Sequence, residues 1–299
     1  MDGQWFDLVD PDVDELLAAV PDLDPDAIEI LTAPARDGRD ARPSLESHGP
    51  YLVGVFLLPI HDDPANTFHY RELACIVTPD RLVTIRKRDP TGEHAPIGLV
   101  PTASAVTAGG GRLLRELVDD VAGAHLDLVD DLYAEIDELE DSLDHISSHD
   151  ARRMLSDLRH EMLHARKNVS STRAAIRRIV DGRLSVSGGE LFPPDVAASF
   201  ADTYDTLVRT IEELDVARDL LASVRDYLQA RVSESQNEIV KTLTVVASLV
   251  LVPTLITGFF GQNFESAFDH GYWSLTVSTA LIVVTTLAQL VVFRWRRWI

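Results

Sequence analysis

The chain has 299 residues and a formal net charge of −21 at pH 7, and it is long enough for a soluble domain and a membrane part. Such an acidic composition argues against nucleic acid as a partner, because nucleic-acid-binding domains carry basic patches. The single cysteine, Cys75, excludes a disulfide framework within the chain.

Residues 1–108 are predicted to form an α+β domain, a mixed sheet with flanking helices. A short strand is expected over 4–9. Two Asp-Pro pairs, beginning at Asp10 and Asp24, indicate helices with an aspartate N-cap and a proline in the first turn. A Pro-Asp turn before Arg81 predicts that the last two of four further strands form a hairpin. These four strand-like runs cover 42–49, 50–60, 68–79 and 81–88.

Residues 109–241 are predicted to form long helices, after a flexible joint over 103–112. Apolar residues recur at spacings of three and four between 128 and 146, which is typical of one helix face. A second helix is expected over 150–180. A third should begin near Pro194 and, without proline or glycine in its way, continue into the membrane. Its apolar face consists of Leu207, Ile211, Leu214, Leu221, Val224 and Leu228.

Two charge-free apolar runs follow, at 242–261 and 273–293, and each has the length of about 20 residues that crosses roughly 30 Å of hydrocarbon. Lys241 precedes the first run and the basic tail 294–299 follows the second. The loop 262–272 between them has acidic residues and no basic ones. Because cytoplasmic segments carry the excess of Lys and Arg, we expect a plasma-membrane protein with both termini in the cytoplasm and the loop outside.

One face of the first apolar run is small or mildly polar. In hydrocarbon such a stripe needs either a partner helix or a water-filled cavity, and spacing alone leaves both open. Because the stripe lacks carboxylates, a pore would suit a strongly hydrated cation such as Mg²⁺, held through its water shell by oxygen ligands. Two spans cannot enclose a pore, so an oligomer would be required. The stripe comprises Asn237, Val240, Thr244, Ser248 or Ala247, Leu251, Thr254, Gly258, Gly261 and Asn263.

The stretch NEIVKTLTVVASLVLVPTLITGFFGQNFES, residues 237–266, closely resembles part of the CorA-type magnesium transporters, the two-span Gly-x-Asn family. It corresponds to the end of the stalk helix, the first transmembrane helix and the signature loop. The resemblance covers nearly the whole chain. It implies a funnel-shaped homopentamer in the lipid bilayer, with stalk helices lining the pore and the loops forming its external mouth. Other similar segments are RPSLESHGPYLVGVFLLP, RLVTIRKRDP, VDDLYAEIDELEDSLDHI, FADTYDTL and RWRRW.

The resemblance also implies roles for single residues. Gly261 and Asn263 match the fixed residues of the signature loop, and Asn263 would offer its side-chain oxygen to the water shell of the arriving ion. Glu265 either raises the local cation concentration or is an ordinary solvated loop charge. Gln262 replaces the usual methionine, which leaves open whether the ion is Mg²⁺, Co²⁺, Ni²⁺ or Zn²⁺, and whether protons are coupled. Polar rings and a hydrophobic constriction are implied at Asn237, Thr244 and Thr254, and at Val240 and Leu243.

The leading hypothesis is Mg²⁺ influx. Because the sequence shows no ATP site, the membrane potential would drive it, with about 4.6 kcal/mol for two charges across 100 mV. The resemblance further implies that Mg²⁺ bound between cytoplasmic domains closes the pore. Asp202 is placed for such a site, with Asp62 or Asp63 of a neighbouring chain as partner, because two carboxylates repel unless a divalent ion bridges them. In so acidic a chain, each of these residues can also be a solvated surface charge.

The sequence HEMLH, residues 160–164, matches the H-E-x-x-H zinc-protease pattern, in which two histidines ligate zinc and the glutamate is the base. Because no third ligand is evident, a chance match is favoured over a membrane-tethered hydrolase built on His160, Glu161 and His164. A non-conducting scaffold is a further alternative. The leading prediction is a transporter and not an enzyme.

Overall fold

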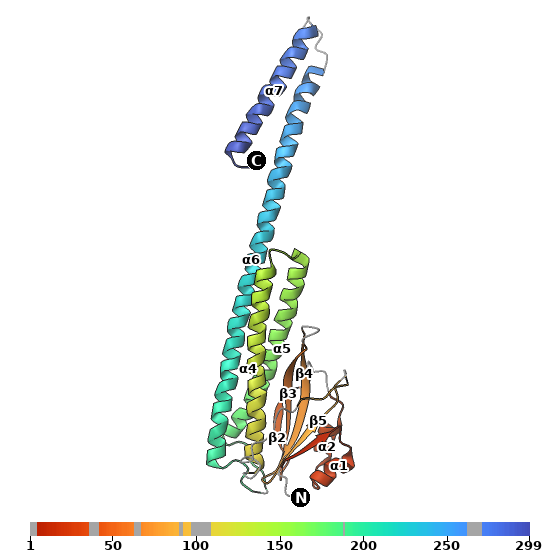
Figure 1. The fold of residues 1–299 in the computed structure, drawn as a ribbon, viewed down its shortest axis with the longest axis vertical. Coiled ribbons are helices and arrows are strands. Elements are labelled where there is room, and N and C mark those ends of the chain that lie inside the picture. The colour runs from red at the N-terminus through yellow and green to blue at the C-terminus, as the bar shows by residue number, and fades with distance from the viewer. Residues whose placement is uncertain are drawn as a thin grey trace. The chain divides into compact units, whose positions relative to one another are not determined.

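The computed structural model describes residues 5–35, 42–62, 67–89, 92–96, 109–187, 189–261 and 271–299. The chain divides into two units, Met1–Arg225 and Asp226–Ile299, which meet within the longest helix. Figure 1 shows the elements of each unit. In chain order they are β1 (Trp5–Val9), α1 (Val13–Ala19), α2 (Pro25–Thr32), β2 (Ser44–Ser47), β3 (Leu52–Asp62), β4 (Thr67–Val77), β5 (Leu82–Arg86), α4 (Gly110–Ser142), α5 (Ser148–Val180), α6 (Pro194–Gly261) and α7 (Gly271–Trp295).

The first unit contains a five-stranded mixed sheet in the order β1-β5-β4-β3-β2. β1 runs parallel to β5, and the other neighbours are antiparallel. The predicted hairpin is confirmed, because β4 pairs with β5 and the backbone N–H of Thr78 donates to the carbonyl of Arg81 at 3.0 Å across the turn. Among the described strands β2 pairs with β3 alone and forms an edge of the sheet.

The two short helices begin at aspartate caps, one of them not where the sequence indicated. Asp24 caps α2 by accepting from the N–H of Ala27 at 2.7 Å, and a proline follows it as predicted. The cap of α1 is Asp12 and not Asp10, because Asp12 and Glu15 form a reciprocal capping box. Asp10 instead has a positive φ of 46° and accepts from the backbone N–H of Arg88, which ties the end of β1 to the end of β5.

Helices cover both faces of the sheet (Figure 1). On one face, α1 and α2 bury Leu16 and Leu31 against strand residues such as Val53 and Ile76. On the other face, α4 and α5 contact β3, β4, β5 and β2. Successive side chains of a strand point to opposite faces of the sheet. Phe56 of β3 is fully buried and does not belong to the core that α1 and α2 cover. Burial on both sides explains why β3 reads as a nearly continuous apolar run.

Glycines at the start of α4 allow close packing, so the prediction of a flexible joint is wrong for residues 109–112. A Cβ atom on Gly110 would lie 2.1 Å from the carbonyl oxygen of Thr78, and one on Gly111 would lie 2.0 Å from that of Leu191. No side chain fits at either position. The glycines therefore let the first turn of α4 press against the β4–β5 turn and the segment before α6. Residues 103–108 of the predicted joint lie outside the described residues.

The long helices α4 and α5 and the first part of α6 pack together in the first unit. The apolar faces predicted on α4 and α6 are buried, apart from the half-buried Ile146. Polar groups add cross-links between these helices. The hydroxyl of Tyr133 donates to the carbonyl of Glu213 at 3.0 Å, and the hydroxyl of Thr203 donates to the carboxylate of Asp119 at 2.9 Å.

The second unit contains the rest of α6, from Asp226 onward, and the whole of α7. Helix α6 continues to Gly261 with Pro253 inside it, as predicted for the third long helix. Both α6 and the part of α7 from Leu275 to Trp295 are long and apolar enough to cross a membrane.

A buried ion pair joins β4 to the end of α2. The Nζ of Lys87 donates to Glu72 Oε1 and to the carbonyl of Ile30, both at 2.7 Å, and the two charged residues are 7% and 5% exposed. The carbonyl of Ile30 would normally accept from the N–H of residue 34, but Pro34 has none. Lys87 supplies the missing donor and places a positive charge at the negative end of the helix dipole.

We expect Lys87→Met to lower the free energy of unfolding by about 3–5 kcal/mol, because it leaves the Glu72 carboxylate buried and unpaired. The measurement is thermal unfolding of the detergent-solubilised full chain. Arg88→Met is the matched control: its partner Asp10 is 3.6 Å away and the pair is exposed, so the expected change is below about 1 kcal/mol. Equal losses in the two variants would contradict this account of the pair.

Candidate functional site

Most of the predicted pore stripe is exposed in the chain. Within the second unit, Val245 and Ile256 of α6 are buried, whereas Val240 and Leu251 of the stripe and Leu243 of the implied constriction are more than half exposed. Ser248 is half-buried and lies at the margin of the stripe. The remaining exposed stripe residues are Asn237, Thr244, Thr254, Gly258 and Gly261. The other residues predicted at the pore mouth, Gln262, Asn263 and Glu265, lie outside the described residues.

The hydroxyl groups of the stripe are oriented by their own helix. Thr244 donates to the carbonyl of Val240 at 2.8 Å, and Thr254 donates to that of Val250 at 2.6 Å. A hydroxyl has one hydrogen, so each oxygen has only lone pairs left to offer outward. Such oxygens accept hydrogen bonds from the water shell of a cation and cannot donate to an anion. The arrangement therefore favours hydrated cations.

An amide on α7 bonds to α6 in the stretch that precedes Pro253. Pro253 has no N–H, so the carbonyl of Leu249 loses its helical donor. On α7, Gln289 donates from Nε2 to the neighbouring carbonyl of Ser248 at 3.3 Å. Its Oε1 is buried and without a partner in the part of the chain that the structure describes. Sequence reasoning missed Gln289, although the only amide in the charge-free run 273–293 is a signal of function.

The predicted regulatory carboxylates are only partly visible. Asp202 lies on an exposed face of α6, and its backbone carbonyl accepts from the hydroxyl of Thr206 at 3.1 Å. Asp62 is the last residue of β3, but its side chain and all of Asp63 lie outside the described residues. The structure thus leaves the Asp202 carboxylate exposed on the surface of one chain, where a carboxylate shared between chains would have to lie.

The HEMLH segment does not form a metal centre. His160 is exposed, and its Nδ1 bonds to the carbonyl of Ser156 at 2.6 Å. Glu161 is half-buried beside β4 and accepts from the backbone N–H of Phe68. No group of three or more His, Cys, Asp or Glu side chains is arranged to hold a metal ion among the residues described. Among these residues, the segment therefore provides no site at which a bound zinc ion could activate a water molecule.

Glu161 belongs to an acidic cluster that sequence reasoning did not single out. Burial raises the pKa of Glu161 to about 7, and repulsion from Glu135 and Asp157 adds to the shift. Burial likewise raises the pKa of Glu135. His61 lies beside this cluster, with Nδ1 at 3.3 Å from an oxygen of Asp131. The Glu161 carboxyl therefore gains or loses its proton near neutral pH.

The sequence profile of the CorA-like Mg²⁺ transporter proteins matches residues 2–297. The chain belongs to the CorA-like Mg²⁺ transporter family. It is 22% identical over 266 residues to the cobalt/magnesium transport protein CorA of Thermotoga maritima, covering 86% of this chain and 73% of that protein. It is 24% identical over 306 residues to the protein of the same name from Methanocaldococcus jannaschii, covering 99% and 91%. The solved CorA magnesium transporter of Methanocaldococcus jannaschii matches the fold with a TM-score of 0.77 at 20% identity, covering 99% of this chain and 91% of that one.

Membership of the CorA-like family decides between the classes of function that the sequence left open. The family consists of transporters, which confirms that this chain is not an enzyme and makes the HEMLH match a coincidence of helix sequence. As a CorA-like protein with two candidate spans, it is a divalent cation transporter of a membrane.

The raised pKa of Glu161 has a testable consequence. The folded state favours the protonated carboxyl, so this contribution to stability is complete below the unfolded value near 4.5 and is lost as pH rises through about 7. We expect Glu161→Gln to abolish this loss and to raise the thermal midpoint at pH 8 relative to the unsubstituted chain. At pH 5 the two proteins should be equally stable. The measurement is thermal unfolding in detergent from pH 5 to pH 8 at fixed Mg²⁺.

Glu140→Gln removes an exposed carboxylate of α4 and serves as the control. It should leave the shape of the pH profile unchanged. The same profile in Glu161→Gln as in the unsubstituted chain would show that Glu161 is ionised throughout this range.

Proposed function

We propose that this protein is a channel that carries Mg²⁺ inward across the plasma membrane and closes when cytoplasmic Mg²⁺ is high. The observation that carries the proposal is the exposed face of α6. There, Thr244 and Thr254 present oxygen lone pairs, and no carboxylate interrupts the apolar run. A fully hydrated divalent cation needs many weak acceptors, whereas a carboxylate would hold it too strongly for passage.

The proposed active form is a homopentamer. One chain supplies two candidate spans, which cannot surround an aqueous path, so the polar face of α6 has to meet copies of itself. The number five rests on the resemblance to the CorA family. In this arrangement α6 lines the pore, and the asparagine ring at Asn237 and the apolar rings at Val240 and Leu243 follow one another along it.

The proposed driving force is the membrane potential. Two charges falling through 100 mV release about 4.6 kcal/mol, which corresponds to a gradient of more than a thousandfold. The sequence contains no glycine-rich phosphate loop that would indicate nucleotide hydrolysis. The proposed orientation places both termini in the cytoplasm and the loop outside. The negative interior then draws cations from the external mouth into the pore that α6 lines.

Four residues are proposed to form that mouth. Gly261 allows the chain to turn, Asn263 offers an amide oxygen to the water shell, and Glu265 raises the local cation concentration. Gln262 adds a second amide where the family usually has methionine. Because amide oxygens suit Mg²⁺ and also tolerate softer ions, Co²⁺, Ni²⁺ and Zn²⁺ are alternative substrates. The relatives from Thermotoga maritima and Methanocaldococcus jannaschii are themselves named cobalt/magnesium transport proteins.

We expect Asn263→Ala to abolish Mg²⁺ uptake while leaving the oligomer intact, because the water shell of the arriving ion loses its first ring of oxygen acceptors. The measurement is voltage-driven Mg²⁺ flux into proteoliposomes, with size-exclusion chromatography to check assembly. Ser266→Ala, in the same loop but outside the Gly-x-Asn motif, should retain normal flux. Normal uptake by Asn263→Ala would refute the assignment of the mouth.

We expect Asp202→Ala to weaken closure by cytoplasmic Mg²⁺, because it removes one of two carboxylates proposed to share the ion. Limited proteolysis of the full chain at increasing Mg²⁺ should need at least a tenfold higher concentration for protection. Glu212→Ala removes the same charge from another exposed position of α6 and should behave as the unsubstituted chain. If Asp202→Ala is protected at the usual concentration, the ligand lies elsewhere.

A further inference from the structure

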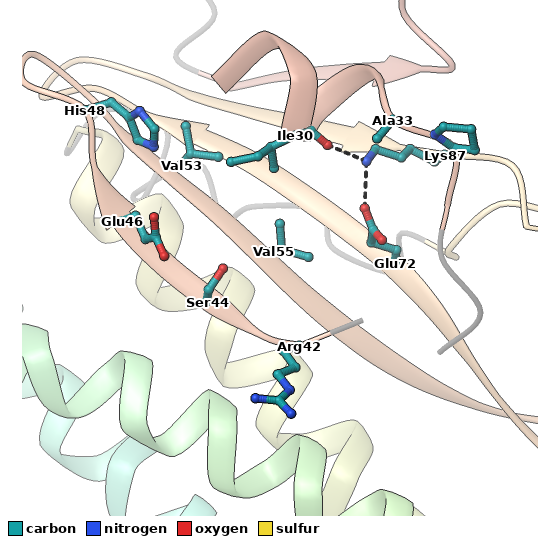
Figure 2. Close-up of a pocket in the computed structure, with 11 residues that line it drawn as sticks. Ile30, Ala33, Arg42, Ser44, Glu46, His48, Val53, Val55, Glu72 and Lys87 are labelled. Carbon is teal, nitrogen blue, oxygen red and sulfur yellow. Dashed lines mark hydrogen bonds and ion pairs between the residues drawn. The ribbon is translucent and has the colours of Figure 1, made fainter. Parts of the chain in front are cut away.

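A pocket opens on the sheet face that α1 and α2 cover (Figure 2). Helix α2 ends at Thr32, and the following Ala33 and Pro34 line the pocket together with Ile30. Val53 and Val55 of β3 line it from the sheet. The cavity holds about 180 Å³, the space of about six water molecules at ~30 Å³ each.

The inner end of the pocket has hydrogen-bonding capacity to spare. Lys87 and Glu72 line it and bond to each other, as Figure 2 shows. An ammonium group has three N–H donors, of which Ile30 and Glu72 take two, and the Glu72 carboxylate accepts one hydrogen bond within the described residues. A donor and an anionic acceptor thus remain side by side at a site that is more than nine-tenths buried.

The rim of the pocket is the polar face of the edge strand β2 and of the residues that flank it. Alternate residues of a strand share one face, so Arg42, Ser44, Glu46 and His48 all line the pocket, while Leu45 between them is buried on the opposite side. Arg42 and Glu46 have no ion pair or side-chain hydrogen bond with any residue that the structure describes. Both charges are therefore available to a ligand at the open side.

We infer that this pocket binds a small aliphatic zwitterion, the class to which free amino acids belong. Two cations and two carboxylates line it, so an anion alone would meet Glu46 and Glu72, and a cation alone would meet Arg42 and Lys87. A zwitterion satisfies both signs, with its carboxylate toward Arg42 and its ammonium toward Glu72. Its hydrocarbon body covers the two valines of the floor. The net charge of −21 further disfavours anionic ligands.

The test is isothermal titration calorimetry on the full chain in detergent, with no ion gradient, so its result is independent of conduction. The probes are L-valine, γ-aminobutyrate and 5-aminopentanoate. Butyrate and butylammonium carry one charge each and serve as the comparison. We expect at least one zwitterion to bind in the millimolar range or tighter, and both singly charged probes to bind at least tenfold more weakly.

Variants locate the binding. Arg42→Gln, at the exposed rim, and Glu72→Gln, at the inner end, should each weaken zwitterion binding at least tenfold. Glu29→Gln, on the exposed side of α2 and outside the pocket, should have no effect. Because Glu72→Gln also disturbs the buried pair, Arg42→Gln is decisive if the other variant unfolds. Absence of heat with all three zwitterions, equal binding of butyrate, or unchanged binding in Arg42→Gln would each overturn the inference.

Discussion

Every backbone polar group in the membrane-spanning parts of α6 and α7 has to find a partner inside the protein, because hydrocarbon offers none. Pro253 removes one donor from the middle of the apolar run of α6 and leaves the carbonyl of Leu249 without its helical partner. The polar side chains nearby bond to other carbonyls: Thr254 and Thr257 donate to those of Val250 and Pro253, and the amide of α7 donates to that of Ser248. The threonines of this stretch thus satisfy their own donors within the helix.

These hydrogen bonds leave the stripe able to contact a cation, because they consume only donors. A threonine that gives its hydrogen to its own helix keeps its oxygen lone pairs, and these are what a hydrated cation requires. An unpaired acceptor remains at Gln289, whose Oε1 is buried without a partner in the described residues. Burying such an acceptor is unfavourable unless another chain or a water supplies a donor. The Oε1 of Gln289 therefore needs a donor, from another chain or from water, before any pore is considered.

Periodicity predicted the elements of this fold well, because it reflects burial, which each stretch of chain encodes locally. The apolar spacing of α4 and α6 and the run of β3 belong to this kind. Contacts between distant segments could not be read in the same way. The glycines at 110 and 111 were mistaken for a flexible joint because their packing partners are far away in sequence. For the same reason, nothing near Lys87 indicated that it caps α2. The cap of α1 was missed for another reason: two local signals competed, and the capping box at Asp12 outcompeted the proline signal at Asp10. The predicted mouth at Asn263 lies outside the described residues.

The range of electrostatic interactions limits which of the many carboxylates could take part in the proposed regulation by Mg²⁺. At about 0.1 M ionic strength charges are screened beyond roughly 10 Å, so most acidic residues of α4 add only a diffuse attraction for cations. A carboxylate can respond steeply to a divalent ion only where a second carboxylate stands within a few ångströms. A single chain offers Asp202 as an exposed carboxylate, and assembly would have to provide its counterpart. Because an effector shifts an equilibrium only by its difference in affinity between states, such a site would make closure depend on both ion concentration and subunit spacing.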